Sequence, residues 1–401
     1  MSTSPIKEAK KEIEDSLILS LFCVRRLGLS FTPPKTKLGY YSEKLTFIMS
    51  VTAMSYHVFS DIVYISLILS NSPGIEDVVP LLHTFGYGVL SLAKVFALSY
   101  KRLVFVQLID ELATIWPMPP LDEESENIKR KRLAGLRLAH RWYFVINMIG
   151  VGFYCVTPII IYFYHYFQGQ EATMGFVWVS WYPFDKYSII GHFVVYVFEI
   201  FIGMITVWIM VSTDLLFSGM ASHIGLLLKL LKKRLESFAS DEQTQDEYYH
   251  EIKECIKLHQ RLIRFCNDLE EAFTQSNFVN IILSSINICC VAFVIVLLEP
   301  VIAMSNKLYL VANLIQIGLI CYYADDILHA NADIAQAAYC SSWYRTDTRC
   351  RRALLFLIQR AQKPIEFTAM NFTNISLVTY TAILTKSYSY FALIYTMYTK
   401  N

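Results

Sequence analysis

The chain has 401 residues, of which 55% are hydrophobic and 17% charged, and its mean hydropathy is +0.40. Soluble globular proteins average about 45–50% apolar and about 25% charged residues, so this composition indicates a polytopic membrane protein. The net charge is only +1, which argues against a nucleic-acid partner. No phosphate loop, nucleophile motif or metal-ligand spacing stands out, so we predict no enzyme activity, no cofactor and no metal.

Residues 1–44 form a polar, mildly amphipathic segment. Its apolar run, Leu17–Val24, is followed by Arg25 and Arg26. The run is too short, and its flanks too polar, for a cleaved signal peptide. We predict a helix on or near the cytosolic face of the membrane.

Seven apolar segments follow, and a spanning helix needs about 20 mostly apolar residues. The sixth is the weakest, because Asn313 and Gln316 interrupt it and Asp325 and Asp326 end it. The predicted spans are Leu45–Leu69, Val78–Tyr100, Tyr143–Phe167, Ile189–Met210, Phe278–Leu298, Tyr309–Tyr323 with its continuation, and Phe372–Met397.

Lys and Arg residues predict the orientation of these spans. Eight fall in residues 1–44, eight in 101–141, eight in 229–264 and six in 345–363, together 30 of the 35 in the chain. Cytosolic loops carry such an excess. We therefore predict a plasma-membrane, multi-pass protein with a cytosolic N-terminus and an extracellular C-terminus.

The inner segments are long and amphipathic. Apolar residues recur at helical spacing from Tyr248 to Leu269, in Leu226–Leu235 and in Ile334–Trp343. We predict that residues 221–275 extend the fourth and fifth spans, and that residues 329–371 complete a cytosolic helical anchor bundle. The outer loops are short except Gln168–Tyr187, whose aromatic residues suit an interface or a cover over a cavity.

Four motifs carry a family resemblance: CYYADDILHANADIAQAAYCSSWY at Cys321–Tyr344, RRALLFLIQRAQKP at Arg351–Pro364, SYSYFALI at Ser387–Ile394, and Pro183-Phe184-Asp185. Together they resemble the insect odorant receptor family. Tyr390-Phe391 stands where the sister gustatory receptors usually have Gln-Phe, which favours the odorant branch. Ala324 departs from the family's usual Gly, so less can be carried over about local packing there.

The resemblance implies an all-α, seven-span subunit of a ligand-gated, non-selective cation channel. Spans one to four (45–220) would contribute to the ligand-binding bundle, spans five and six occupy 276–328, and 372–401 would hold the pore-lining seventh span. It implies a heterotetramer with an odorant coreceptor subunit, a small volatile ligand, contact with membrane lipid, permeant cations and a sensory dendrite. The chain resembles the ligand-specific subunit, because it lacks the coreceptor's longer second intracellular loop.

The last span carries the predicted pore residues. At about 100° per residue, Lys386, Leu393 and Met397 lie near one face of the helix. The resemblance places the family's hydrophobic gate at Leu393 and Met397, and an apolar ring can close a pore by dewetting. Ser389 is a further candidate pore residue. Lys386 suits a cation pore least: it could face the pore in one subunit only, snorkel, or pair with Asp325 or Asp326.

The resemblance also places the ligand between the outer halves of spans two, three, four and six. Such a pocket needs apolar and aromatic walls with few polar groups. Core packing is the alternative for each candidate. The candidates are His83, Thr84, Tyr87, Phe153, Tyr154, Thr157, Tyr196, Ile200, Met204, Asn313 and Gln316.

Two further pairs of polar residues lie within predicted spans. Glu199 could bond to His192 or polarise a ligand, and we predict a structural role for it. His57 and Asp61 are expected to pair locally.

Two rival functions stay open. A transporter is one alternative function, although no repeat relates the halves. A metabotropic seven-span receptor is the other, although the inferred orientation and motifs argue against it.

Overall fold

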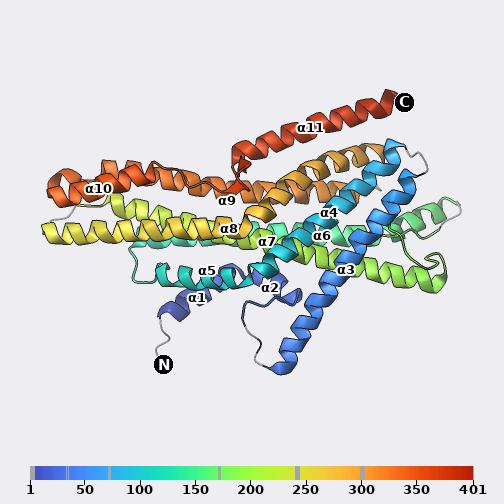
Figure 1. The fold of residues 1–401 in the computed structure, drawn as a ribbon, viewed down its shortest axis with the longest axis horizontal. Coiled ribbons are helices and arrows are strands. Elements are labelled where there is room, and N and C mark those ends of the chain that lie inside the picture. Colours follow the sequence, from blue (N-terminus) through green and yellow to red (C-terminus); the bar gives the residue numbers. More distant parts are fainter. Residues whose placement is uncertain are drawn as a thin grey trace.

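The computed structural model describes residues 5–32, 34, 36–70, 74–169, 173–239, 244–298 and 303–400. Within these residues the chain is an elongated bundle of helices (Figure 1), which confirms the predicted all-α class. The only other regular elements described are a small hairpin of β1 (Thr368–Ala369) and β2 (Thr373–Asn374), and a 3-10 turn, η1 (Trp343–Arg345). The helices are α1 (Pro5–Ser16), α2 (Ile18–Arg26), α3 (Lys37–Leu69), α4 (Ile75–Tyr100), α5 (Arg102–Ile115), α6 (Glu123–Phe167), α7 (Ile189–Glu236), α8 (Gln245–Leu297), α9 (Met304–Cys340), α10 (Thr348–Ala361) and α11 (Leu377–Lys400).

Six of the helices in the described ranges are long and apolar enough to cross a membrane: α3, α4, α6, α7, α8 and α9. Each contains one of the first six predicted spans, except that Leu298, the last residue of the fifth, lies just past the end of α8. The chain is thus a multi-pass membrane protein, since its uninterrupted apolar helices satisfy their own backbone groups as lipid requires. The seventh predicted span corresponds to α11, which has 24 residues and is not among these six.

The longest helices begin at side-chain caps. Asp122 accepts a hydrogen bond from the Ser125 amide (3.2 Å), and Ser188 accepts one from the Gly191 amide (3.2 Å), before α6 and α7. At α8 the Thr244 hydroxyl caps the Glu247 amide while the Glu247 carboxylate accepts from the Thr244 amide at 2.7 Å. Such caps satisfy amides that have no partner within the helix, so they fix where each helix starts.

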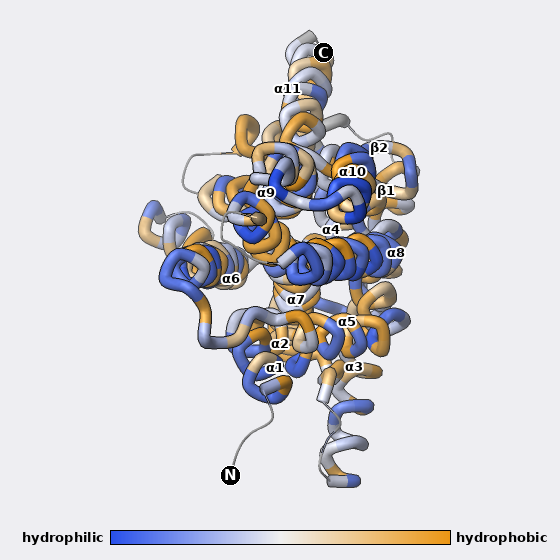
Figure 2. Tube along the Cα trace, turned by 90° about the vertical axis from the view of Figure 1, so that its left-hand side faces the viewer, coloured by the Kyte–Doolittle hydropathy of each residue, from blue (hydrophilic) through white to orange (hydrophobic). Residues whose placement is uncertain are grey.

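At the end of the bundle farthest from the C-terminus of α11, helices α7, α8 and α9 pack with α10 (Figures 1 and 2). We call this end of the molecule the base; polar residues cover its surface. Asn331 is fully buried there: it bonds to His259 Nε2 at 2.9 Å and donates to the Ala361 carbonyl at 3.0 Å and the Lys363 carbonyl at 3.2 Å. Helices α7, α8 and α9 continue beyond the apolar segments, but α9 ends at Cys340, so Trp343, predicted to lie in its continuation, belongs to η1 instead. This base holds α8 and α9 at a fixed spacing.

The amino-terminal helices pack against α7. Leu17, between α1 and α2, is fully buried. A Cβ at Gly219 would clash with the end of the Leu17 side chain, so a larger residue there would force Leu17 to move. Ser20 donates to the Ser212 carbonyl at 2.8 Å, and Ser16 Oγ lies 2.8 Å from His223 Nε2. The run predicted to lie at the membrane face is therefore partly core.

Helix α11 begins at Leu377, so the predicted start of the last span at Phe372 is wrong. Strands β1 and β2 occupy that stretch, with a turn in which Met370 and Asn371 have φ values of 50° and 58°. Asparagine tolerates this left-handed geometry, and the local polar residues bond to the turn instead of continuing a helix. From there α11 diverges from the bundle (Figure 1), touching α8 through Ser387 and α9 through Tyr380.

Candidate functional site

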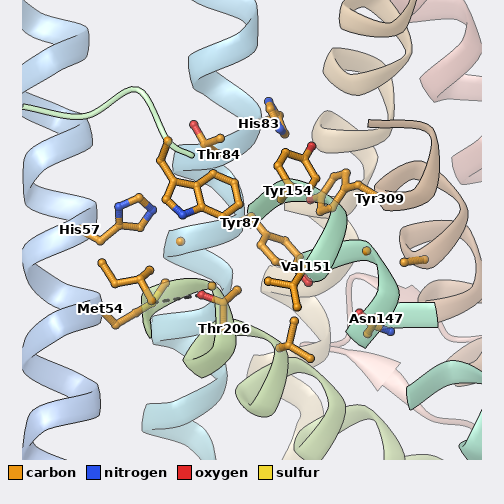
Figure 3. A pocket seen from close by; sticks show the side chains of 17 residues that line it. Met54, His57, His83, Thr84, Tyr87, Asn147, Val151, Tyr154, Thr206 and Tyr309 are labelled. Carbon is orange, nitrogen blue, oxygen red and sulfur yellow. Dashed lines mark hydrogen bonds between the residues drawn. The ribbon is translucent and has the colours of Figure 1, made fainter. Parts of the chain in front are cut away.

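A cavity of about 60 Å³ lies between α3, α4, α6, α7 and α9 (Figure 3). Its walls are mainly aromatic and aliphatic, with a few hydroxyl, imidazole and amide groups. This is the composition of a site for a small, mostly apolar molecule. The lining residues are Met54, His57, His83, Thr84, Tyr87, Gly88, Asn147, Gly150, Val151, Tyr154, Trp178, Ile202, Gly203, Thr206, Val207, Tyr309 and Ala312.

Aromatic rings make most of the wall. Tyr309 contacts Tyr87 edge-on, with ring centroids 5.0 Å apart, and His83 at 5.7 Å. Tyr154 stacks on Trp178 at 5.1 Å. Such ring pairs contribute about 0.5–1.5 kcal/mol beyond the area they bury, so they give the cavity a defined shape.

Four of the predicted ligand residues line this cavity: His83, Thr84, Tyr87 and Tyr154. Thr157 lines a neighbouring space and bonds to Ser305 Oγ at 2.6 Å. The other predicted residues are not among those that line the cavity. Phe153 is 40% exposed, and Tyr196 donates to the Cys155 carbonyl. Ile200 and Met204 are part-buried on α7, Asn313 is buried on α9 one turn after Tyr309, and Gln316 donates to Asp214.

The loop before α7 closes one side of the cavity. Glu199, fully buried on α7, accepts from the amides of Val177 (2.7 Å) and Trp178 (3.3 Å) and from the Tyr182 hydroxyl (3.1 Å). The Trp178 indole N–H donates to the Glu199 carbonyl at 3.3 Å. Glu199 is thus structural as predicted, but its suggested bond to His192 is wrong: His192 Nε2 has no partner among the described residues, and its ring packs on Phe176.

A second contact holds the same loop on α3. Ser180 donates to Asp61 at 2.8 Å, and His57 Nε2 lies 3.7 Å from the other Asp61 oxygen. The predicted pairing of His57 with Asp61 is confirmed. Since His57 also lines the cavity, this pair ties the loop to the cavity wall.

A buried polar network lies next to the cavity, toward the base. Asp214 on α7 accepts from Lys94 (2.5 Å, α4), Tyr143 (2.9 Å, α6) and Gln316 (2.9 Å, α9). Gln316 also donates to Asn280 of α8 at 3.2 Å. These groups are almost completely buried, which makes charges costly. The Lys94–Asp214 ion pair is stable there because three donors, counting Lys94 itself, surround the Asp214 carboxylate.

On α11 the predicted pore residues point away from the bundle. Leu393 is 58% and Met397 50% exposed, and Lys386 and Ser389 are also exposed. The suggested pairing of Lys386 with Asp325 or Asp326 is wrong. Asp326 instead binds Arg132 and Lys229, both at 2.7 Å, and Asp325 pairs with His329 at 3.2 Å.

Sequence reasoning missed several lining residues, Tyr309 above all, and it named the aromatic residues of the Gln168–Tyr187 loop as a possible cavity cover without identifying Trp178 as the one in the wall. Asn147, Val151 and Tyr154 follow helical spacing, as do Gly203, Thr206 and Val207, so each face was readable once one member was known. Trp178 lies in a loop, and only its bonds to Glu199 place it in the wall. Local sequence carries no signal for such a long-range contact.

Comparisons with known proteins agree with this architecture. The family model described as 7tm Odorant receptor matches residues 75–388. The chain is 26% identical to Odorant receptor 85c of Drosophila melanogaster over 89% of this chain and 92% of that one, and 26% identical to Putative odorant receptor 85d of the same species over 88% and 86%. The solved olfactory receptor OR5 of Machilis hrabei, in complex with eugenol, has a TM-score of 0.83 and 14% identity over 98% of this chain and all of that chain. This chain belongs to the insect odorant receptor family, among the individual odorant receptors rather than the coreceptor.

Proposed function

We propose that this chain is the ligand-specific subunit of a ligand-gated, non-selective cation channel in the plasma membrane of a sensory dendrite. It would assemble with an odorant coreceptor subunit, as a heterotetramer, and bind a small volatile molecule in the cavity between α3, α4, α6, α7 and α9. The observation that carries the proposal is an aromatic cavity, closed by the 173–188 loop, with a buried polar network that reaches α8, the helix to which α11 bonds through Ser387.

The size of the cavity supports a gating role for the ligand. An engineered cavity of about 150 Å³ holds one benzene molecule, whereas this cavity has about 60 Å³. A ring-sized ligand must therefore separate the surrounding helices as it binds. It binds the expanded arrangement more tightly, and this difference in affinity shifts the population toward it.

The polar network gives the expansion a route to α11. Asn147 lines the cavity and donates to the carbonyl of Tyr143, whose hydroxyl bonds to Asp214. Gln316 links Asp214 to Asn280, which accepts from Ser284 at 3.3 Å. The next residue, Ser285, accepts through its carbonyl from Ser387 of α11 at 3.0 Å.

We take α11 as the seventh span and the pore-lining helix. With 24 residues at 1.5 Å each it is about 36 Å long, enough for a hydrocarbon core of about 30 Å. Seven spans place the termini on opposite sides, as the charge distribution requires. The exposed face with Lys386, Ser389, Leu393 and Met397 would then meet the pore or neighbouring subunits.

The gate is tested by Leu393→Ser with Met397→Ser in one chain. Polar side chains favour water in the constriction, so we expect a larger basal current without ligand. Val378→Ser, on the same helix near its other end and 76% exposed, is the matched control and should leave basal current unchanged. Equal basal currents in the double variant and the wild type, at equal surface expression, would count against the gate.

The function itself is tested by recording currents in cells that express this chain with and without the coreceptor, during exposure to a panel of volatile compounds. We expect a rapid, ligand-dependent current with a near-linear current–voltage relation, only when both chains are present. A delayed response that requires G proteins would favour a metabotropic receptor. Uptake of the compound without conductance would favour a transporter.

A further inference from the structure

The polar groups at one end of the cavity share a property that bears on the ligand. His83, Thr84 and Tyr154 lie at this end (Figure 3), and each donates its polar hydrogen to another protein group. The His83 Nδ1 lies 2.6 Å from the Pro80 carbonyl, the Thr84 hydroxyl donates to the Leu81 carbonyl at 2.9 Å, and the Tyr154 hydroxyl donates to Asn306 Oδ1 at 2.6 Å.

The bond to Pro80 fixes the tautomer of His83. A carbonyl oxygen only accepts, so Nδ1 carries the hydrogen, and in the neutral ring Nε2 is an acceptor. Nε2 has no partner in the described part of the chain, although the His83 side chain is only 7% exposed. An imidazole acceptor without a donor is therefore available in the wall of a mainly aromatic and aliphatic cavity.

The neighbouring oxygens offer the same chemistry. Because the hydroxyl hydrogens of Thr84 and Tyr154 are committed, these oxygens present lone pairs to a ligand. At the other end, Thr206 directs its hydrogen toward Met54 Sδ (3.5 Å) and Asn147 donates to the Tyr143 carbonyl (2.8 Å). Tyr87 is a lining hydroxyl for which no bond is described, and the Tyr309 oxygen is shielded by surrounding atoms and lies near Asn313 of its own helix.

We propose that His83, Thr84 and Tyr154 form an acceptor-only subsite that selects a ligand with a hydroxyl donor, a small alcohol or phenol, over the ketone, aldehyde or ester of the same skeleton. This rests on the proposed function, since it assigns the ligand class of the same cavity. A hydroxyl hydrogen would bond to His83 Nε2. A carbonyl oxygen at that end would lose its bonds to water and face lone pairs, and a buried acceptor without a donor is strongly disfavoured.

Binding to the purified receptor tests the inference without requiring channel activity. Dissociation constants are measured from ligand-induced thermal stabilisation for three matched pairs: cyclohexanol and cyclohexanone, benzyl alcohol and benzaldehyde, 1-hexanol and hexanal. We expect each alcohol that binds to do so about tenfold or more tightly than its carbonyl partner. Unpaired buried polar groups discriminate by at least this factor in other sites.

Variants assign the preference to the subsite. His83→Phe keeps a ring but removes Nε2, so the alcohol-to-carbonyl ratio should fall to within about threefold. Thr84→Val, which removes one lone-pair oxygen with little change of shape, should lower the ratio by a smaller factor and covers the case in which His83→Phe does not fold. His192→Phe is the matched control: this part-buried histidine, whose Nε2 also has no described partner, is not among the residues that line the cavity, and its replacement should leave the ratio unchanged.

Equal or tighter binding of the carbonyl partners overturns the inference, as does the absence of binding by all three alcohols. A preserved ratio in both His83→Phe and Thr84→Val also overturns it. Alcohol-selective binding without any ligand-gated current, in the presence of the coreceptor, would support the ligand class while contradicting the proposed channel function. The two proposals therefore fail in different measurements.

Discussion

Replacing Asp214 with asparagine is expected to abolish ligand-evoked current and most surface expression. The substitution leaves the Lys94 ammonium buried without a counter-charge, since both side chains are at most 3% exposed. Removing one partner of a buried ion pair costs about 3–5 kcal/mol. Net stabilities of folded proteins are only about 5–15 kcal/mol, so a large fraction of the receptor should fail to fold. Surface labelling and current recording measure the two effects.

The double variant Lys94→Met with Asp214→Asn distinguishes the charge from the hydrogen bonds. Without the ammonium, no charge is left unpaired, and the asparagine oxygen can still accept from Tyr143 or Gln316. We expect surface expression to recover to near the wild-type level. If the double variant is as poorly expressed as Asp214→Asn alone, the ion pair is not the cause of the loss.

Replacing Glu199 with leucine is expected to raise the half-maximal ligand concentration about tenfold or more while surface expression is largely kept. Leucine accepts no hydrogen bonds, so the Val177 and Trp178 amides and the Tyr182 hydroxyl lose their acceptor. Each unsatisfied donor costs about 1–3 kcal/mol in a buried position. The loop relieves this cost by moving into water, which takes Trp178 out of the cavity wall. Dose–response curves measure the loss.

Two milder substitutions grade the effect. Tyr182→Phe removes one hydrogen bond and should raise the half-maximal concentration by less than Glu199→Leu. Glu199→Gln keeps one acceptor oxygen and should fall between the wild type and the leucine variant. A wild-type response in Glu199→Leu would show that the loop does not hold the ligand in place.

The sequence predicted well what depends on periodicity. The long extensions of α7, α8 and α9 follow from apolar residues at helical spacing, and His83, Thr84 and Tyr87 line one cavity together because a short stretch of one helix carries them. Fewer of the candidates on other helices line that cavity. Phe153 and Tyr196 lie on apolar helices whose rotation the pattern does not fix, because lipid-facing and core-facing sides are both hydrophobic.

Contacts between distant segments were beyond the sequence. Lys94 was recognisable as a charge within a span, but its partner Asp214 lies on another helix, and the three donors that converge on that carboxylate come from α4, α6 and α9. Glu199 was assigned a partner on its own helix, whereas its acceptor atoms bind a loop. A turn at Met370 and Asn371, made of residues that a helix also accepts, makes the last span begin later than predicted.

The sequence by itself determined that this is a helical membrane protein of the odorant receptor family. The length of the apolar segments, the distribution of Lys and Arg and the short motifs are local properties, and they can be recognised without knowing the fold. Only the tertiary structure decided which side chains surround the cavity, which loop closes it, and which hydrogens remain free for a ligand. These depend on helix rotation and on hydrogen bonds between residues far apart in the chain, and a one-dimensional pattern does not encode either.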